Sequence, residues 1–429
     1  MDPAMNSSQF PGKFFFRFSF IFLGGSTILC WDNISDVIHR AFSTVPFNYE
    51  AFYGSMRAPL HWLDAHLFHT GYDPKVHGTF PGDNHFGALF YLSLLLVALI
   101  GAIAWSILDR KRQNYDRLNY WFRVYLRYIL AIVIFSYGLD KLIPVQMSHP
   151  NIETLLLPFG QISRFSLFWN FMGVSPGYMI VTGSIEVIGA LLLLNRHTVA
   201  LGCIVVLGVL INVVSLNIFY NVPVKLYSTQ LLLYTLFLLY PYGSRLVQLF
   251  FAGRSVSLTS PGYGFQTPWK KNMLTAALIG VPFLLLVPIG IGIVHRYHRN
   301  ENNARLQKDY EVTAFVAKDT LPPLSTDTLR WRRFLISYSI YRPKTYAIVW
   351  DMQDDLDFFD CEIDSSKKTF TLADGPDSLH RHVFSYSNPE KAKLMLTGTW
   401  KDKGVQILMN DVAIDSMWLN RDNIRLIRN

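Results

Sequence analysis

Long apolar runs, separated by short polar segments, constrain this chain more than any other feature of its sequence. A bilayer core about 30 Å thick requires about 20 mostly apolar residues in a helix that crosses it. Stretches that approach this length are Phe14–Trp31, Phe86–Leu108, Phe122–Leu139, Pro176–Leu194, Thr198–Phe219, Ser228–Tyr242 and Met273–Val294. The sequence therefore predicts an integral membrane protein, an all-α bundle of about seven transmembrane helices.

The composition excludes several other classes of protein. Of 429 residues, 51% are hydrophobic and only 16% are charged, against about 25% charged in an average soluble domain. These values exclude a disordered chain, collagen and a coiled coil. The formal net charge of +8 comes from basic residues between the apolar runs, where membrane topology explains them better than nucleic-acid binding. We expect the lipid bilayer, and no nucleic acid, as a partner.

The basic residues also predict the orientation of the chain, because lysine and arginine favour cytoplasmic loops. With the N-terminus in the cytoplasm, the residues that lie inside are Lys13, Arg110, Lys111, Arg112, Arg117, Arg196, Arg245, Arg254, Lys270 and Lys271. The loops 32–85, 140–175 and 220–227 are then external, and so is the C-terminal region. The cluster His295–Arg299 is a local exception. No cleavage site follows Phe14–Trp31, which we expect to stay as an anchor.

In the last third of the chain the long apolar runs give way to short alternating ones. These are Arg333–Ile340, Thr345–Met352, Leu356–Ile363, Lys368–Leu372, His382–Tyr386, Lys393–Trp400, Val405–Met409 and Ile424–Ile427. Turn sequences such as Asp364–Lys367 separate them, and this spacing predicts an antiparallel all-β sandwich or barrel. The expected domains are 1–120 (N-terminal helix pair with external loop), 121–255 (membrane core), 256–300 (last helix), 301–324 (linker) and 325–429 (extracytoplasmic β domain).

An ionisable residue within a membrane-spanning helix is costly and therefore indicates function. Glu186 lies in the otherwise apolar segment Ile180–Leu194 and shares a helical face with Gly183 and Gly189. Small residues there allow a neighbouring helix to bury the carboxylate, although Glu186 could also serve only to hold helices together. Lys141, at the end of the third run, either reaches interfacial water or folds back to pair with Glu186. If desolvated, Lys141 and Glu186 are the candidate catalytic residues.

Further polar residues near these two define a candidate ligand site. Asn212 and Ser215 lie three residues apart on one helical face, and Lys225 follows Pro223 on the same side as Lys141. The candidate ligand-binding residues are Tyr137, Gln146, Asn212, Asn217, Tyr220 and Lys225. Lysines, a carboxylate and amides near one leaflet suit an anionic or quinone-like head group. A bundle with polar packing and interfacial lysines remains an open alternative.

Histidines and cysteines favour no metal site. The first external loop holds His61, Asp64, His66, His69 and His77. Leucine and tryptophan alternate with them as in an amphipathic helix at a membrane surface, and no HExxH-type ligand set is present. The three cysteines, Cys30, Cys203 and Cys361, are too few for a disulfide scaffold and show no CxxC spacing. Cys30 and Cys361 would both be external, which leaves open whether they pair.

One stretch of the chain resembles the DoxX family of small bacterial membrane proteins. The residues that carry this resemblance are Tyr137-Gly138-x-x-Lys141-Leu142, Gln146, Pro150, Gly183-x-x-Glu186, Asn212 and Tyr220–Ser228. The chain is similar to the long form seen in Bacteroidetes, which has extra N-terminal helices and a C-terminal β domain. The resemblance covers residues 120–250 and, more loosely, 86–119 and 330–429. It implies a four-helix core in the bacterial inner membrane and, as in some members, a quinone-linked role in sulfur-compound oxidation.

The segment around Lys141 is also distantly similar to the membrane domain of vitamin K-dependent carboxylases, which carries an extramembrane β domain as well. Only Tyr137, Gly138, Lys141 and Leu142 match. This similarity implies a role for Lys141 as a catalytic base.

Three functions follow as hypotheses, and the residues do not decide whether the chain is an enzyme. The first is binding of a quinone or lipid-like ligand, with quinone as the cofactor, by a redox enzyme or its membrane subunit. The alternative is a non-enzymatic scaffold or assembly protein whose β domain, 325–429, docks an envelope partner. Trp350, Trp400 and Trp418 are candidates for that contact if they are exposed. A transporter is the third, although no inverted repeat is visible.

Overall fold

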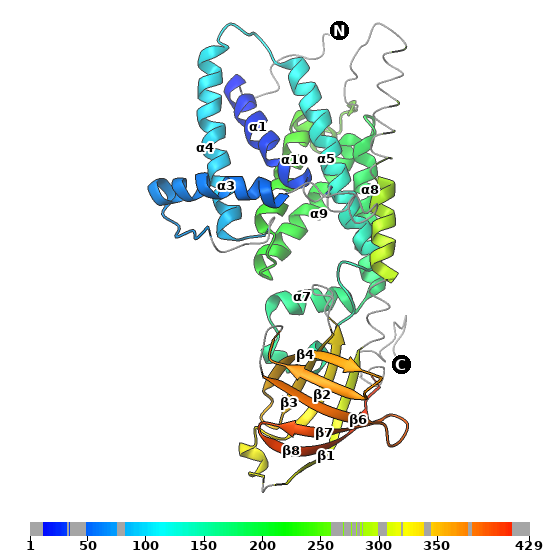
Figure 1. Ribbon diagram of the computed structural model, residues 1–429. Helices are drawn as coiled ribbons and strands as arrows, with labels where there is room; N and C mark the ends of the chain where they lie inside the picture. The colour runs from blue at the N-terminus through cyan, green and yellow to red at the C-terminus, as the bar shows by residue number, and fades with distance from the viewer. Residues whose placement is uncertain are drawn as a thin grey trace. The chain divides into compact units, whose positions relative to one another are not determined.

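The chain forms a helical unit and a unit built around a β-barrel (Figure 1). The computed structural model describes residues 12–31, 34, 49–74, 82–258, 269, 276, 280, 284, 286–298, 307–318, 321–338, 345–375 and 380–413. Described residues up to Met147 and from Ser163 to Arg296 belong to the helical unit. Residues 148–162 join the described residues after Arg296 in the barrel unit.

Five helices in the described part of the chain are long and apolar enough to cross a membrane. They are α1 (Lys13–Ser26, continued to Trp31), α4 (His85–Leu108), α5 (Asp116–Leu142), α8 (Pro176–Leu194) and α9 (Val199–Phe219). Each corresponds to an apolar run in the sequence. This is the architecture of a multi-pass membrane protein.

The two other predicted spans have different outcomes. The run Ser228–Tyr242 forms α10 (Lys225–Leu239), which has only 15 residues, followed by the 3₁₀ turn η4 (Tyr240–Tyr242) and α11 (Gly243–Phe251). Pro241 lies in that turn and has no amide hydrogen with which to continue α10. Most of the run Met273–Val294 lies outside the described residues, although residues 286–298 are helical. The prediction of seven spanning helices is therefore not confirmed.

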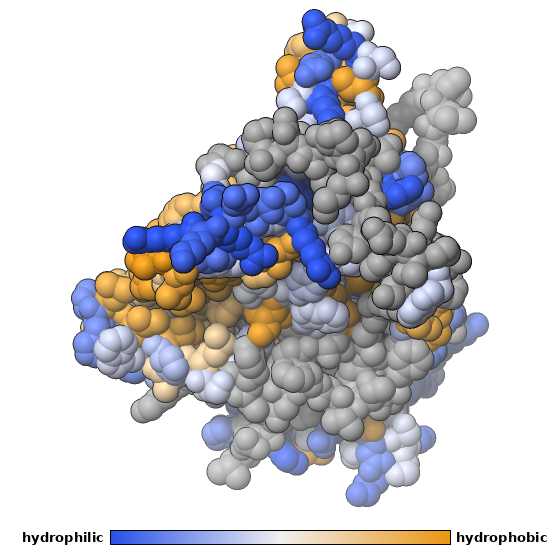
Figure 2. Space-filling view, turned by 90° about the horizontal axis from the view of Figure 1, so that it is seen from above, coloured by the Kyte–Doolittle hydropathy of each residue, from blue (hydrophilic) through white to orange (hydrophobic). Residues whose placement is uncertain are grey.

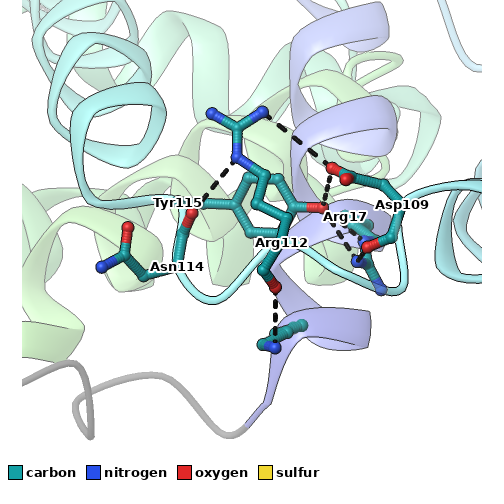
Figure 3. Close-up of polar contacts among 6 residues, drawn as sticks. Arg17, Asp109, Arg112, Asn114 and Tyr115 are labelled. Atoms are coloured by element: carbon teal, nitrogen blue, oxygen red, sulfur yellow. Dashed lines mark hydrogen bonds and ion pairs between the residues drawn. The ribbon is translucent and has the colours of Figure 1, made fainter.

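One end of the helical unit is held together by a buried arginine (Figure 3). Arg17 of α1 donates to the Tyr115 hydroxyl at 2.8 and 3.0 Å and to the Ser106 hydroxyl at 2.8 Å. The Tyr115 hydroxyl donates in turn to Asp109 at 2.8 Å, which lowers the pKa of that carboxyl. Lys13 donates to the Arg112 carbonyl oxygen at 2.8 Å. These contacts join the start of α1 to the connection between α4 and α5, where hydrophilic side chains gather (Figure 2).

Two ion pairs hold the opposite end of these helices. Asp83, just before α4, accepts hydrogen bonds from the Lys225 and Leu226 amides at 2.7 and 3.0 Å, and its carboxylate lies 3.3 Å from Lys225 Nζ. Asp140, near the end of α5, pairs with Arg296. Arg296 belongs to the basic cluster that the sequence marked as an exception to the charge rule. Its pairing with Asp140 compensates one of the positive charges of that cluster.

The loop 32–85, which the sequence predicts to be external, contains α3 (Tyr49–Leu63), which continues as a π-helical turn, η2 (Asp64–Phe68). Leu60 packs on Phe86 and Leu89 of α4, whereas Trp62 and Leu67 are exposed. Asp64 closes the turn by accepting hydrogen bonds from Thr70 and Tyr72 amides. The predicted helix is therefore present and has an exposed apolar side, and its position at a membrane surface stays a prediction. His77 lies outside the described residues.

The second unit contains a closed antiparallel barrel in which each strand pairs with the next and the first pairs with the last. The strands are β1 (Lys308–Ala317), β2 (Trp331–Tyr338), β3 (Thr345–Asp351), β4 (Leu356–Asp364), β5 (Thr369–Ala373), β6 (Arg381–Ser387), β7 (Lys393–Trp400) and β8 (Lys403–Asp411). Lys401 and Asp402 form the turn between β7 and β8 with φ of 48° and 65°, as a two-residue hairpin requires. Between the predicted alternatives, the structure is a barrel and not a sandwich.

Side chains fill the barrel, and a short segment covers part of its outside. Trp331, Phe334, Phe384 and Trp400 belong to one continuous apolar core within the strands. On the outer face, Leu335, Ile348 and Trp350 form a second cluster, against which Leu156 of α6 (Ile152–Leu156) packs. Burial raises the pKa of Glu153 in the same helix, while a hydrogen bond with Tyr346 opposes that shift.

The domain boundaries differ from the predicted ones in two places. Residues 301–324, expected as a linker, contain β1, which closes the barrel between β2 and β8. Residues 148–162, assigned by the sequence to the membrane core, belong to the barrel unit. The run Ile424–Ile427, predicted as a strand, lies outside the described residues.

Candidate functional site

Lys141 and Glu186 form a buried ion pair between α5 and α8. Lys141 Nζ lies 2.8 Å from Glu186 Oε1 and 2.7 Å from Oε2. The two residues are only 8% and 5% exposed. Of the two arrangements considered for Lys141, the structure has the one in which it folds back to the carboxylate. The position of Glu186 near the middle of α8 places this pair within the apolar part of the helical unit.

Two glycines allow α5 and α8 to approach closely enough for this pair to form. A Cβ atom at Gly183 would lie 2.6 Å from the Gly138 carbonyl oxygen and 2.7 Å from the Leu142 amide nitrogen. A Cβ atom at Gly138 would lie 2.9 Å from the Val187 amide nitrogen. These obstacles are backbone atoms, so a larger residue at either position requires the helices to separate.

A cavity of about 540 Å³ lies beside the ion pair, within the range of about 300–1,000 Å³ that is usual for small-ligand pockets. Its walls come from α5, α8, α9 and α10 together with α7 (Arg164–Gly173). Most of the lining is apolar or aromatic, including Phe168, Trp169 and Leu216. The charged members of this lining are Lys141 and Glu186. An apolar pocket with a few convergent polar groups is the usual form of a ligand site.

Helix α7 is an element of the site that the sequence reasoning did not predict. Its Phe168 and Met172 pack with Met147, Met179 and Val222 in one buried cluster at an edge of the cavity. The sequence indicates this helix only by its N-cap residue. Ser163 accepts a hydrogen bond from the Ser166 amide at 3.1 Å. Because α7 has only 10 residues, it cannot cross a membrane. The search for long apolar runs therefore passed over it.

Most of the predicted site residues line this one cavity. They are Tyr137, Lys141, Gln146, Glu186, Asn212, Asn217 and Tyr220. Their contacts differ, however. Asn217 is 5% exposed and donates to the Ser228 hydroxyl at 2.9 Å, so that it joins α9 to α10. The side-chain oxygen of Gln146 is buried and accepts no hydrogen bond from the described residues.

Lys225 and Ser215 do not belong to this lining. Lys225 binds Asp83, as described above, and so connects the starts of α4 and α10. The Ser215 hydroxyl donates to the Ile211 carbonyl oxygen at 2.8 Å within its own helix. Lys225 is thus placed in a structural contact and not beside Lys141.

The metal and thiol candidates are also separate from the cavity. No group of three or more metal-binding side chains occurs among the described residues. Cys30, Cys203 and Cys361 are free, buried thiols. Cys361 belongs to the barrel core, where burial raises its pKa to about 12, which keeps it protonated at neutral pH.

These features define a multi-pass helical membrane protein that carries a β-barrel and an apolar cavity with a buried ion pair. Within this class, the chain belongs to the same family as YwoB of Bacillus subtilis (strain 168), which is described as an uncharacterized protein. The two are 33% identical over 116 residues, which is 27% of this chain and 72% of YwoB. No protein-family model matches the chain. No solved structure matches it either.

Proposed function

We propose that the chain is a DoxX-like protein of the bacterial inner membrane that binds a quinone-like or lipid-like ligand, as a redox enzyme or as its membrane subunit. The observation that carries this proposal is the Lys141–Glu186 pair, which is buried at the edge of an apolar cavity in a membrane-spanning bundle. Removing these two charges from water costs several kcal/mol for each ion. Such pairs in membranes therefore mark functional sites.

The polar groups of the cavity suit a ligand that both accepts and donates hydrogen bonds. Lysine has three N–H donors, of which two point to the Glu186 oxygens; the third is available for a ligand carbonyl oxygen. The buried oxygen of Gln146 has no donor among the described residues, so a ligand hydroxyl would satisfy it. A quinone supplies the carbonyl oxygen and its reduced form supplies the hydroxyl. In this proposal Lys141 and Glu186 orient the ring and exchange protons with it.

The proposed placement of the chain in the membrane rests on its charges. Lys13, Arg112 and Arg117 lie at the end of the helical unit that carries the α4–α5 connection. We assign that end to the cytoplasm because basic loops favour this side. The N-terminus is then cytoplasmic and the barrel is periplasmic.

The test is to look for a bound ligand in the purified protein. Lipophilic molecules are extracted from wild type and from the Lys141→Met/Glu186→Met variant and identified by mass and absorbance. We expect a quinone in the wild-type extract, less of it in the variant, and a rise in the melting temperature of the wild type when quinone is added. If the wild-type extract holds no quinone or lipid that the variant lacks, and neither protein responds to added quinone, the proposal is overturned.

A second candidate is a scaffold whose barrel docks an envelope protein. Side chains fill the interior of the barrel, which leaves its outer surface for binding. Trp350 and Trp400, considered as contact residues, are only 5% and 1% exposed, and Trp418 lies outside the described residues. Docking would therefore use the outer surface of the strands. Co-purification of envelope proteins with the full-length chain tests this candidate. Substitution of exposed Phe358 or Val383 by Asp should weaken the binding of the partner.

A further inference from the structure

The wall of the cavity between α8 and α9 is open to the surface of the helical unit. Tyr178 and Ile185 of α8 both line the cavity and are 47% and 45% exposed. Asn212 of α9 and Tyr220, which directly follows α9, line the cavity and are also exposed. Lys141 of α5 and Tyr227 of α10 are buried on two other walls, whereas Phe171 of α7, whose ring contacts Tyr178, is 60% exposed. The cavity therefore opens sideways between α8 and α9, with α7 at one edge of the opening.

The packing of α8 on α9 explains why the gap lies where it does. A Cβ atom at Gly202 would lie 2.8 Å from the Leu193 amide nitrogen, and one at Gly189 would lie 3.0 Å from Val206 Cγ2. These glycines hold the two helices together near their short connection. Farther from it, α8 presents Ile185, Thr182 and Tyr178 to the cavity. The helices are thus in tight contact at one end and separated by the cavity at the other.

The surface around the gap has the composition of a lipid-facing wall. Val181 and Ile188 of α8 are 57% and 54% exposed, and Ile211 and Ile218 of α9 are 52% and 51% exposed. On spanning helices, exposed apolar side chains at this spacing face the acyl chains. The gap consequently leads from the cavity into the lipid phase.

Asn212 is an exception on this wall, because its amide is exposed at the rim and no described residue forms a hydrogen bond with it. In the hydrocarbon region, an amide without a hydrogen-bond partner costs several kcal/mol. A polar group on the ligand would supply the missing partner. This places a hydrogen-bonding portion of the ligand between Asn212 and the ion pair.

The charges of the cavity restrict the head group further. Lys141 and Glu186 neutralise each other, and no other charged residue lines the described cavity. An anionic head group that accepts the third N–H of Lys141 would lie beside the Glu186 carboxylate, which like charges disfavour. An uncharged head group with carbonyl or hydroxyl oxygens avoids this repulsion.

We infer that the ligand is an amphiphile with an uncharged head and an apolar tail, and that it enters from the membrane between α8 and α9. The head lies at Lys141 and Glu186, and the apolar tail leaves through the gap past Ile185 and Asn212. This inference rests on the proposed function, because it concerns the same cavity. It adds the class of the ligand and its route.

The experiment uses the full-length chain in lipid nanodiscs and two naphthoquinones that share a ring: menaquinone-4, which has a prenyl tail, and menadione, which has none. Binding is followed by quenching of tryptophan fluorescence, with Trp169→Phe as the check that the signal comes from the cavity lining. We expect menaquinone-4 to bind at least about tenfold more tightly than menadione, a difference of about 1.4 kcal/mol.

A matched pair of variants tests the route. Ile185→Trp fills the gap, whereas Ile188→Trp, one turn along the same exposed face, lies outside the cavity lining. We expect Ile185→Trp to lose about tenfold in affinity for menaquinone-4 and Ile188→Trp to bind as wild type. Asn212→Leu should also bind more weakly while its melting temperature is unchanged or higher. Because Asn212→Leu adds no bulk in the gap, it separates a lost ligand contact from misfolding.

The outcomes distinguish the two proposals. If wild type binds both quinones equally and Ile185→Trp binds like Ile188→Trp, the tail and the route are wrong while the proposed function stands. If wild type binds neither quinone, both proposals fail. Competition by dioleoyl phosphatidylglycerol at equal mole fraction would identify a two-chain anionic lipid as the occupant and overturn the uncharged head group.

Discussion

Lys141 and Lys225 were predicted to share one site, yet each has its own carboxylate partner. Lys141 meets Glu186 across the α5–α8 contact, and Lys225 meets Asp83 at the start of α4. The first pairing could be predicted, because Glu186 is an isolated acid in an apolar run and Gly183 marks the face where a helix approaches. The second could not, since Asp83 lies in a polar loop where nothing distinguishes it from other acids.

The buried pair should be sensitive to the loss of either partner and tolerant to the loss of both. Lys141→Met or Glu186→Met leaves one charge buried without its partner, and we expect each to cost about 3–5 kcal/mol. The double variant removes both charges and replaces them with apolar side chains, so it should recover most of that loss. Thermal unfolding in detergent of wild type, both single variants and the double variant measures this coupling. Equal and additive losses would show that the pair contributes no coupling energy.

Gly183 should be essential to the same contact. Gly183→Ala places a Cβ atom against the backbone of α5, which pushes the helices apart and lengthens the Lys141–Glu186 contact. We expect a loss of about 1–3 kcal/mol, as for other overpacked interiors. Gly208→Ala in α9 is the matched control, because its added Cβ meets no atom within 4 Å and alanine favours helix. Melting temperatures compare the two, and equal shifts would contradict a specific role of Gly183.

Elements with a long periodic signal were predictable, and those defined by tertiary contacts were not. The runs that became α4, α8 and α9 were recognised because a helix that crosses a bilayer needs their length. By contrast, β1 follows a helix without a glycine- or proline-rich turn, and its role is visible only once β8 closes the barrel on it. Residues 148–162 have no strand or span signal at all. Their place is set by the contact of Leu156 with the outer barrel cluster.

Strand β1 introduces a pH dependence into the barrel through Asp309. This carboxyl is fully buried, accepts no hydrogen bond from the described residues, and has Arg333 as a partner at 3.7 Å. Burial raises its pKa from 3.8 to about 6. Between these values the folded chain keeps a proton that the unfolded chain loses, so stability must fall as the pH rises. The slope is up to about 1.4 kcal/mol per pH unit for one proton.

We therefore expect the barrel to lose stability from pH 4 to pH 6 and to change little above pH 6, with this slope removed in Asp309→Asn. Hydrogen exchange of peptides from β1 and β8 at several pH values, corrected for intrinsic rates, measures it. Asp364→Asn is the control with the opposite sign: a hydrogen bond from Ser366 lowers the pKa of Asp364, so its contribution is lost as the pH falls. An unchanged slope in Asp309→Asn would refute the assignment.

At the scale of the whole molecule, the described hydrogen bonds show which connections of the helical unit lie together at each of its two ends. Lys13, Arg17, Asp109 and Tyr115 join at one end. The pairs Asp83–Lys225 and Asp140–Arg296 lie at the other ends of α4 and α5. The positively charged connection between α4 and α5 is thus at the first end. This sorting follows from contacts within the fold and is independent of the charge rule that predicted it.

One end of the helical unit must then face the cytoplasm and the other the opposite side of the membrane, and labelling can decide which is which. The native cysteines are buried, so new ones report with little background. We expect a membrane-impermeant maleimide to label Lys367→Cys, on an exposed barrel turn, in right-side-out vesicles, and Asn114→Cys, between α4 and α5, only in inverted ones. The reason is that the basic Arg110–Arg112 segment should be retained in the cytoplasm. Detergent-solubilised protein, where both sites must react, is the control. Labelling of Asn114→Cys in right-side-out vesicles would reverse the proposed orientation.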